Sequence, residues 1–420
     1  MRIAMVSEHA SPLAVITGED AGGQNVHVAE LATGLARIGH EVIVYTRRAQ
    51  ATIPDRVPFG EGVWVEHLRA GPAGPLSKDR LPPHMPEFGR ELKKAWQRDR
   101  PDVVHAHFWM SGMAAIPVAA DLGVPVLQTF HALGSTKRHF QGEADTSPPE
   151  RDRVERFVAR SSALVVATSQ EEKEQLLTWG VRPERVTVVP CGVDMDRFTP
   201  EGPQAPGGER PRVLSLGRLV PRKGVDTIIR AMPDVPEAEL LIAGGPYPHE
   251  LETDPEISRL RTIADEVGLT DRVRFLGCVD RADVPALIRS VDVAVNVPWY
   301  EPFGISTVES MACGIPVIAS RVGGHKDTVV HGETGLLVPS HQPGRLAQTL
   351  SWLLAEPAVR TLFSTAARER AEELYSWTEV VRATEECYRS VTSVTVPTPR
   401  TFHDRPSARA VGTVGRGSEE

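Results

Sequence analysis

Cysteine and aromatic residues are scarce in this 420-residue chain, and basic residues are outnumbered by acidic ones. Its four cysteines lie far apart and none has C-x-x-C spacing, which argues against a disulfide framework and against a thiolate zinc site. A formal net charge of -8 argues against nucleic acid or a membrane surface as the main partner. No apolar run approaches the roughly 18 residues of a membrane-spanning helix, and the first residues are too short an apolar stretch for a signal peptide. We therefore expect a cytoplasmic protein with no nucleic-acid partner and no membrane insertion.

Several motifs that define catalytic classes are also missing. No G-x-G-x-x-G or Walker A string occurs, so neither a dinucleotide site nor a P-loop is predicted. No G-x-S-x-G elbow supports Ser-His-Asp hydrolysis. His105 and His107 lie on one predicted strand, but no third ligand accompanies them, so we expect one of them to face the core and assign no metal site.

Predicted strands alternate with predicted helices along the chain. A length of 420 residues fits two domains of about 200 residues each. Strands at 2–7 and 41–46 flank a helix at 25–38, and a second series starts at 212–216 after the Pro- and Gly-rich stretch 194–211. This alternation predicts an α/β fold of two Rossmann-like, doubly wound halves that face a cleft, with ligands beyond the C-terminal strand ends. The expected divisions are a first domain 1–195, a linker 196–211, a second domain 212–375, a helix returning to the first domain 376–395 and a disordered tail 396–420.

The stretch Trp299–Glu309 connects a predicted strand to a predicted helix. Gly304 permits close backbone approach to a ligand, and the helix after it points free N–H groups and its positive dipole end at the loop, which suits a phosphate. Glu301 in the loop and Glu309 about two turns into the helix would accept hydrogen bonds from hydroxyls near the two ends of that ligand. Phosphate flanked by hydroxyls is the pattern of a nucleotide sugar. Taken alone, E-x7-E is also typical of an ordinary strand–helix loop with solvated glutamates.

The basic stretch Gly217–Gly224 follows the first strand of the second half. Arg218 and Lys223 would converge on a diphosphate, the guanidinium as a bidentate clamp and the ammonium as a point charge. A cluster of this kind is also typical of a solvated basic turn. In the first half, Gly23 before a helix forms a second close-approach site, and His131 follows a strand at the expected edge of the cleft.

The donor-side elements resemble the retaining glycosyltransferases of the GT-B family that includes sucrose and sucrose-phosphate synthases. That family has the E-x7-E pair and a G-R-L-x-x-x-K-G element, both matched here. The resemblance implies that Glu301 meets the donor sugar, Glu309 the ribose, and Arg218 and Lys223 the phosphates, with His131 a contact to the sugar rather than a proton shuttle. The implied donor-binding residues are Gly23, Arg218, Lys223, Glu301, Phe303, Gly304 and Glu309, and the implied catalytic residues are Arg218, Lys223, Glu301 and His131.

A narrower resemblance lies in the N-terminal half. The strings His9–Ala14 and Asp20–Val28, together with Gly71–Lys78, are similar to those of the inositol-phosphate N-acetylglucosaminyltransferases of mycothiol biosynthesis, over about residues 1–392. That family has Tyr where this chain has Phe108 and Thr where it has Ala132, so two hydroxyl contacts to the acceptor are missing. The implied acceptor-binding residues are His9, Asp20, Asn25 and Lys78, with an arginine of the pair Arg151 and Arg153.

These resemblances imply a retaining transfer of a hexosyl group from a nucleoside diphosphate sugar, UDP in the first instance, to a small polyol, sugar or sugar-phosphate acceptor other than inositol 3-phosphate. No cofactor beyond the nucleotide sugar is expected. A nucleotide-sugar epimerase on the same fold and a non-catalytic sugar-nucleotide-binding protein remain alternatives. The sequence leaves the oligomeric state open, a homodimer included. We further expect residues 376–392 to pack on the first domain and form the second strand of a hinge.

Overall fold

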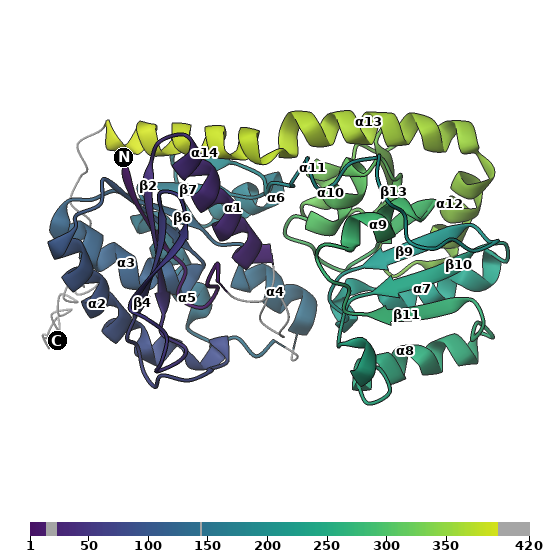
Figure 1. The fold of residues 1–420 in the computed structure, drawn as a ribbon, viewed down its shortest axis with the longest axis horizontal. Coiled ribbons are helices and arrows are strands. Elements are labelled where there is room, and N and C mark those ends of the chain that lie inside the picture. The colour runs from purple at the N-terminus through teal and green to yellow at the C-terminus, as the bar shows by residue number, and fades with distance from the viewer. Residues whose placement is uncertain (14–22, 143–144, 394–420) are drawn as a thin grey trace, which may run out of the picture.

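The structure is a computed structural model, and it describes residues 1–13, 23–142 and 145–393 (Figure 1). Asp20 and the expected tail 396–420 lie outside the described residues. The described chain forms two α/β halves, each with one mainly parallel sheet between helices. Two doubly wound halves were predicted from the alternation of strands and helices, and that prediction is confirmed. In the described part of the chain, no helix combines the length and the apolar character needed to cross a bilayer.

The first sheet has the strand order β3-β4-β2-β1-β5-β6-β7-β8. Every pairing in it is parallel except β3 with β4, which is antiparallel. The strands near its centre are buried on both faces, because helices cover both sides of a parallel sheet. Its strands are β1 (Arg2–Val6), β2 (Glu41–Arg47), β3 (Arg56–Gly60), β4 (Val63–Leu68), β5 (Val103–His107), β6 (Val126–Thr129), β7 (Leu164–Ala167) and β8 (Val186–Val188).

The second sheet is parallel throughout, with the order β11-β10-β9-β12-β13-β14. Its first and fourth strands in chain order, β9 and β12, are neighbours, so the strand order reverses between them. Ligands in such sheets bind outside the carboxyl ends of the strands at this reversal. The strands are β9 (Arg212–Leu216), β10 (Glu239–Ala243), β11 (Val273–Gly277), β12 (Val293–Asn296), β13 (Val317–Ser320) and β14 (Gly335–Val338).

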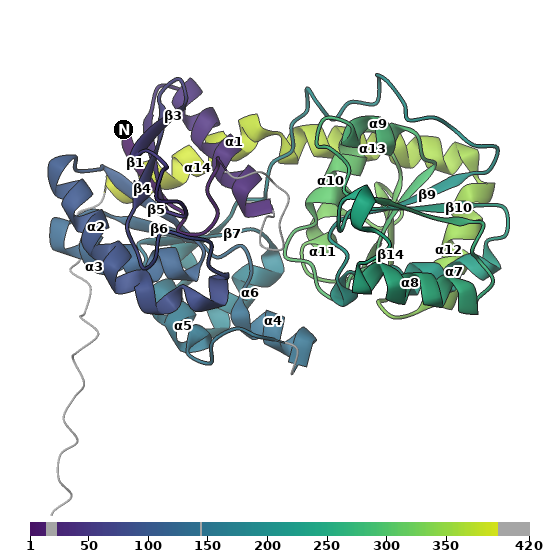
Figure 2. The same cartoon turned by 60° about the horizontal axis from the view of Figure 1, so that its bottom comes forward.

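Helices flank both sheets, and α13 and α14 run one after the other along both halves (Figures 1 and 2). In the first half the helices are α1 (Gly23–Arg37), α2 (Met85–Arg98), α3 (Trp109–Leu122), α4 (Gly134–Gln141), α5 (Arg151–Ser161) and α6 (Gln170–Thr178). The later helices are α7 (Val225–Ala231), α8 (Pro255–Glu266), α9 (Val284–Arg289), α10 (Ile305–Ala312), α11 (His325–Thr328), α12 (Pro343–Ala355), α13 (Pro357–Tyr375) and α14 (Trp377–Thr392).

Side-chain hydrogen bonds cap the N-terminus of α6. The Ser169 side chain accepts a hydrogen bond from the Glu172 amide at 3.2 Å. The Glu172 carboxylate does not close a capping box on Ser169, although its place three residues after Ser169 would allow one. It accepts instead from the amide and the hydroxyl of Thr168, both at 2.8 Å. One carboxylate oxygen that satisfies two donors stabilises this turn as well as the expected box would.

The chain crosses between the halves twice, and the two crossings touch. The Val193 amide donates to the Tyr375 carbonyl at 2.7 Å, and Val193 forms an isolated parallel bridge with Ser376. The Pro-rich segment before β9 is tied to the second half, because Arg289 donates to the Thr199 and Pro203 carbonyls. The two connections between the halves therefore run side by side at Val193 and Ser376.

Helix α14 packs on the first half. Its buried residues Val380, Val381 and Tyr388 share a hydrophobic cluster with strands β1 and β2 and helix α1. The Tyr388 hydroxyl lies 2.8 Å from His105 Nδ1, at the centre of the first sheet. Figure 2 shows the same arrangement from another side, with α14 beside α1.

Candidate active site

The loop after β12 has the backbone that its glycine predicts. Gly304 has φ of 97° and caps the N-terminus of α10 in the left-handed region, where a side chain would be strained. A Cβ on Gly304 would lie 2.7 Å from the ring of His325. The imidazole of His325 is held by Thr307 Oγ1 at 3.0 Å. Burial lowers its pKa to about 4, so a neutral imidazole packs against the loop.

Lys223 and Glu301 form a direct ion pair across this loop. The sequence interpretation placed the lysine on phosphate and the glutamate on sugar as opposed groups, whereas the structure joins them, because opposite charges attract strongly where little water reaches. Burial opposes ionisation of Glu301, but the charges of Lys223 and Arg222 outweigh it and hold the pKa of the carboxyl at about 2. Burial, with repulsion from Arg222 and Arg218, lowers the pKa of Lys223. Arg218 itself is exposed at the end of β9.

Glu309 also has a cationic partner. Its carboxylate is 4% exposed and lies 2.5 Å from Arg281, which comes from the segment between β11 and α9. Burial raises the pKa of Glu309 in spite of that pair. The Phe303 side chain packs in the core of the second half against Tyr375, at 5.7 Å between ring centroids, so only its backbone can face a ligand in the loop.

The first half contributes a group of histidines. His131 follows β6 with φ of 61°, a strained value for a residue with a side chain. Its Nε2 lies 3.1 Å from Nδ1 of His107, and the His27 ring is 5.1 Å away. Burial, with repulsion from neighbouring histidines, holds the pKa of His131 well below its ordinary value. His131 is therefore neutral at pH 7 and suited to hydrogen bonding rather than to carrying a charge.

His105 and His107 correct a sequence expectation. Both are buried, with ring centroids 4.2 Å apart, because residues two apart on a strand share one face. The sequence interpretation expected one of the two side chains to face the core, whereas both do and they lie on the same face. In the segments that the structure describes, no group of three or more His, Cys, Asp or Glu side chains could hold a metal ion.

The two walls of the cleft meet at Gly23. A Cβ there would lie 2.5 Å from Ile305 Cδ1, the first residue of α10. The N-terminus of α1 therefore reaches the loop 297–304 before α10, termed the donor loop below, and a larger residue at this position would force the Ile305 side chain to move.

The predicted acceptor residues fall into buried and accessible groups. His9 Nδ1 lies 2.7 Å from the buried carboxylate of Glu8, and its ring packs on Phe108. Arg151 is 2% exposed and donates to Glu155 and to the Ala132 carbonyl, both at 2.7 Å. It also stacks over Phe108 at 5.0 Å. Arg151 thus supports the wall of the site.

The other predicted acceptor residues lie around this wall. Arg153 is exposed on the outer face of α5, and Lys78 is half-buried at the start of a short 3-10 turn. Asn25 is 4% exposed and donates to the Ser11 carbonyl at 2.9 Å. These residues come from different elements, so the structure groups them by region.

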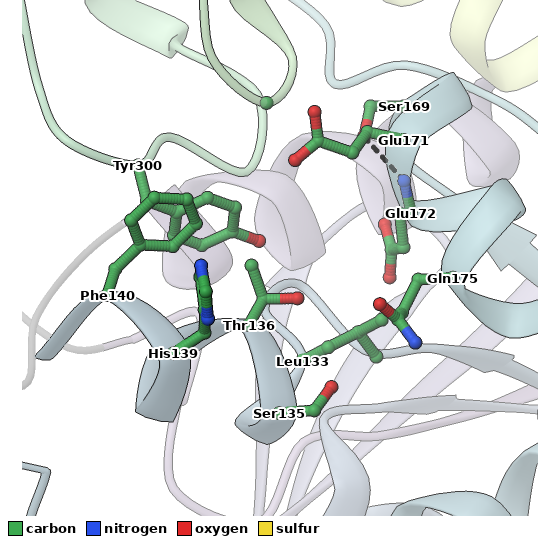
Figure 3. Close-up of a pocket in the computed structure, with 11 residues that line it drawn as sticks. Leu133, Ser135, Thr136, His139, Phe140, Ser169, Glu171, Glu172, Gln175 and Tyr300 are labelled. Atoms are coloured by element: carbon green, nitrogen blue, oxygen red, sulfur yellow. Dashed lines mark hydrogen bonds between the residues drawn. The ribbon is translucent and has the colours of Figure 1, made fainter. Parts of the chain in front are cut away.

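Two cavities open between the halves. The smaller, about 110 Å³, lies beside the two paired connections between the halves. Its lining includes Asn25, Glu30, Arg281 and Trp377. The larger, about 400 Å³, lies between α4, α6 and the donor loop (Figure 3). The larger cavity, termed the α4–α6 cavity below, is lined by Leu133, Ser135, Thr136, His139, Phe140, Ser169, Glu171, Glu172, Gln175, Tyr300 and Gly323.

Sequence reasoning missed the partners that hold the predicted residues. Arg222, Arg281, Glu8, Glu155 and His107 each contact a predicted site residue. Arg222 lies within the basic stretch and could have been found there. Glu8 and Glu155 are close in sequence to His9 and Arg151, one and four positions away, and the i, i+4 spacing could have signalled the second pair. Arg281 and His107 are far in sequence from the side chains they contact, and no local pattern signals them.

Both halves of the chain match known glycosyltransferase families. Residues 21–197 match the model of Glycosyltransferase Family 4, and residues 199–370 match that of the group 1 glycosyl transferases. A D-inositol 3-phosphate glycosyltransferase of Mycolicibacterium smegmatis is 35% identical over 423 residues, covering 98% of this chain and 95% of that protein. A D-inositol 3-phosphate glycosyltransferase 2 of Catenulispora acidiphila is 34% identical over 406 residues, covering 92% and 94%.

Solved structures show the same fold. Sucrose-phosphate synthase from Thermosynechococcus elongatus superposes with a TM-score of 0.85 at 31% identity, covering 93% of this chain and 99% of that chain. Anabaena HepE, solved with UDP, superposes with a TM-score of 0.74 at 20% identity, covering 93% and 100%. These matches identify the architecture as GT-B, the fold expected from the donor motifs.

Proposed function

Because the chain belongs to the group 1 glycosyl transferases, with a Glycosyltransferase Family 4 domain before that region, we propose that it moves a hexosyl group from a UDP-sugar to a small polyol, sugar or sugar-phosphate acceptor, with retention. Its activity as a glycosyltransferase follows from the family. The donor, the acceptor and the stereochemistry are the proposal.

The observation that carries the proposal is the charged donor loop. Lys223 and Glu301 pair at the C-terminal end of the second sheet, and Gly304 opens α10 beside them. A diphosphate bound here would draw Lys223 and Arg218 to its oxygens, and Glu301 would then accept hydrogen bonds from sugar hydroxyls. Cations and helix amides aimed at the departing diphosphate stabilise charge that grows in the transition state.

Retention is what the resemblance to the sucrose-phosphate synthase family implies, and the states of Glu301 and His131 bear on its route. A double displacement needs a carboxylate free to attack the anomeric carbon. Glu301 is paired with Lys223 and its pKa is about 2; when a diphosphate draws Lys223 away, hydrogen bonds from sugar hydroxyls would occupy the carboxylate and make it a weak nucleophile. His131 is neutral and tied to His107. We therefore propose that the acceptor attacks from the face that the diphosphate leaves, with His131 as a hydrogen-bond contact to the sugar.

The acceptor proposal rests on the first half. Lys78 and Arg153 supply positive charge on the first half, and His9 and Asn25 supply polar groups, which suits a phosphorylated or polyol acceptor. The similar proteins are named for D-inositol 3-phosphate. Phe108 carries no hydroxyl where it stacks on Arg151, so we propose that the preferred acceptor differs from inositol 3-phosphate.

We also propose that the halves close about the paired backbone at Val193 and Ser376. The domains are taken as 1–195 and 212–375, with 196–211 between them and 376–395 returning to the first. Closure about this pivot would exclude water that could hydrolyse the donor.

Mass spectrometry of products from a panel of nucleotide sugars and acceptors tests the proposal. UDP-sugars should give a hexosyl product. The NMR coupling constant of its anomeric proton should show the same anomeric configuration as the donor. The control for substitutions of Lys223 is Lys93→Met, which removes a surface ion pair with Asp121. Inversion, or transfer only to inositol 3-phosphate, would contradict the corresponding part of the proposal.

A further inference from the structure

The α4–α6 cavity is unlike the phosphate-binding surroundings of the donor loop. Its volume of about 400 Å³ falls within the roughly 300–1,000 Å³ of pockets that hold small ligands. Its lining contains two carboxylates, several hydroxyl and amide groups and no lysine or arginine. Glu171 is paired with Lys326, so Glu172 is the carboxylate left to face a ligand. Hydroxyl groups would find both donors and acceptors there, whereas a phosphate would find no lysine or arginine in the described lining.

Two buried oxygens beside the cavity have no hydrogen-bond partner among the described residues. Glu172 is 8% exposed, and its Oε1 is unpartnered while Oε2 accepts both bonds from Thr168. Ser135 Oγ, on α4 across the cavity, is unpartnered as well. Buried polar atoms are nearly always paired, so an orphan at a cavity wall indicates a missing ligand group or water. Burial raises the pKa of Glu172.

An aromatic pair closes one side of the cavity. Phe140 of α4 stacks on Tyr300 of the donor loop at 5.4 Å between centroids and 9° between planes. Figure 3 shows this pair on one wall, with Glu172 and Gln175 on the other and Thr136 between them. Aromatic faces pack well against the C–H faces of sugar rings, since both are apolar.

The cavity adjoins the proposed reaction centre. Tyr300 precedes Glu301 in the chain, and the Gly324 amide donates to the Glu301 carbonyl at 2.9 Å. On the other wall, Leu133 is two residues after His131 and follows Ala132, whose carbonyl accepts from Arg151. The cavity therefore lies between the donor sugar and the proposed acceptor region.

We propose that the α4–α6 cavity is a subsite for a neutral, polyhydroxylated group, the part of the acceptor that extends away from its charged end. This inference rests on the proposed function. It implies an acceptor larger than a single phosphorylated ring, for example one that carries an added glycosyl unit.

Maltose serves as a neutral probe in saturation-transfer NMR with the full-length protein. The wild type should transfer saturation to maltose. Thr136→Trp fills the cavity from α4 and should reduce the signal at least fivefold, while Thr136→Ser should keep it within twofold. Gln175→Trp fills the cavity from the opposite helix and should reduce the signal as Thr136→Trp does. If one of the two variants misfolds, the other still tests the proposal. Tm and UDP binding establish that each variant is folded.

Competing ligands separate the alternatives. Spermidine and glucose 6-phosphate should displace maltose poorly, because the subsite takes neither a cation nor an anion. Absence of transfer in the wild type, unchanged transfer in both filled variants, or displacement mainly by spermidine or by glucose 6-phosphate would overturn the proposal. Hexosyl transfer to acceptors without an added glycosyl unit reports on the proposed function separately, and Thr136→Trp should leave it within twofold.

Discussion

Replacement of Lys223 by Met should separate the two tasks of the Lys223–Glu301 ion pair. In the folded protein the substitution leaves Glu301 buried without its closest cation. Removing one partner of a hydrogen-bonded charge pair costs about 1–3 kcal/mol, and about 3–5 kcal/mol where the pair is fully buried. The two side chains are 19% and 12% exposed, so we expect the lower range. For a domain of this size, that lowers Tm by several degrees.

The pH dependence of this loss has a fixed sign. The folded pKa of Glu301 is about 2, below the unfolded value of about 4.3. The ion pair therefore stabilises the wild type fully above the unfolded value and loses its effect as the pH falls towards 2. In Lys223→Met the pKa of Glu301 should rise. The Tm difference between wild type and variant should be largest at pH 7 and should shrink below about pH 4.

Thermal unfolding from pH 3 to 8, UDP calorimetry and transfer kinetics measure these effects together. The single variant should lose on the order of 10²-fold in kcat/KM, because it lacks charge opposite the departing diphosphate. The double variant Lys223→Met/Glu301→Gln should regain most of the stability and none of the activity. The control Lys93→Met, at an exposed pair with Asp121, should change Tm and kcat/KM little. Equal UDP affinity in wild type and in an Arg218→Ala/Lys223→Ala protein would refute the reasoning.

Three further perturbations test other parts of the site. Phe108→Tyr with Ala132→Thr should raise kcat/KM for inositol 3-phosphate roughly tenfold, since each restored hydrogen bond is worth about 0.5–1.5 kcal/mol; wild-type turnover of that acceptor above all others would contradict this. Truncation after Val396 should leave activity and Tm intact, whereas truncation after Leu374 removes α14 and should lower both; full activity of the shorter protein would exclude a role for the pivot. His107→Leu should lower kcat up to about tenfold while His107→Asn, which keeps an N–H near the Nδ1 position, should not; the tautomer of the neighbouring imidazole, read from ¹⁵N shifts, should change only in the leucine variant.

The fold was predictable because its signals are local. Hydrophobic runs of strand length that alternate with helical periodicity specify a doubly wound sheet without knowledge of any contact. Gly304 was predictable for the same reason, since a left-handed residue before α10 needs glycine. Phe108, which has φ of 78° ahead of α3, shows the limit. Nothing in its sequence neighbourhood signals that backbone, which only the packing of His9 and Arg151 on its ring explains.

Pairings between distant residues could not be predicted. Lys223 and Glu301 are 78 positions apart, and sequence spacing gives only the regions they come from. The histidine group is similar, because His27, His105, His107 and His131 come from three elements and meet only when the sheet forms. Motif reasoning therefore singled out Lys223, Glu301 and His131 as candidates and missed the distant pairings that hold them.

The charges of the donor loop explain why a diphosphate suits it. The described side chains that surround the loop and the base of α10 are Arg218, Arg222, Lys223, Arg281, Glu301 and Glu309. Arg222 acts with Lys223 on Glu301, and Arg197 acts with Arg281 on Glu309, so cations outnumber carboxylates around the loop. This excess of positive charge suits an anionic diphosphate. Under the proposed function, a bound diphosphate would draw Lys223 away from Glu301, and the freed carboxylate would accept hydrogen bonds from sugar hydroxyls. That exchange would leave neither Lys223 nor Glu301 as an unpaired buried charge.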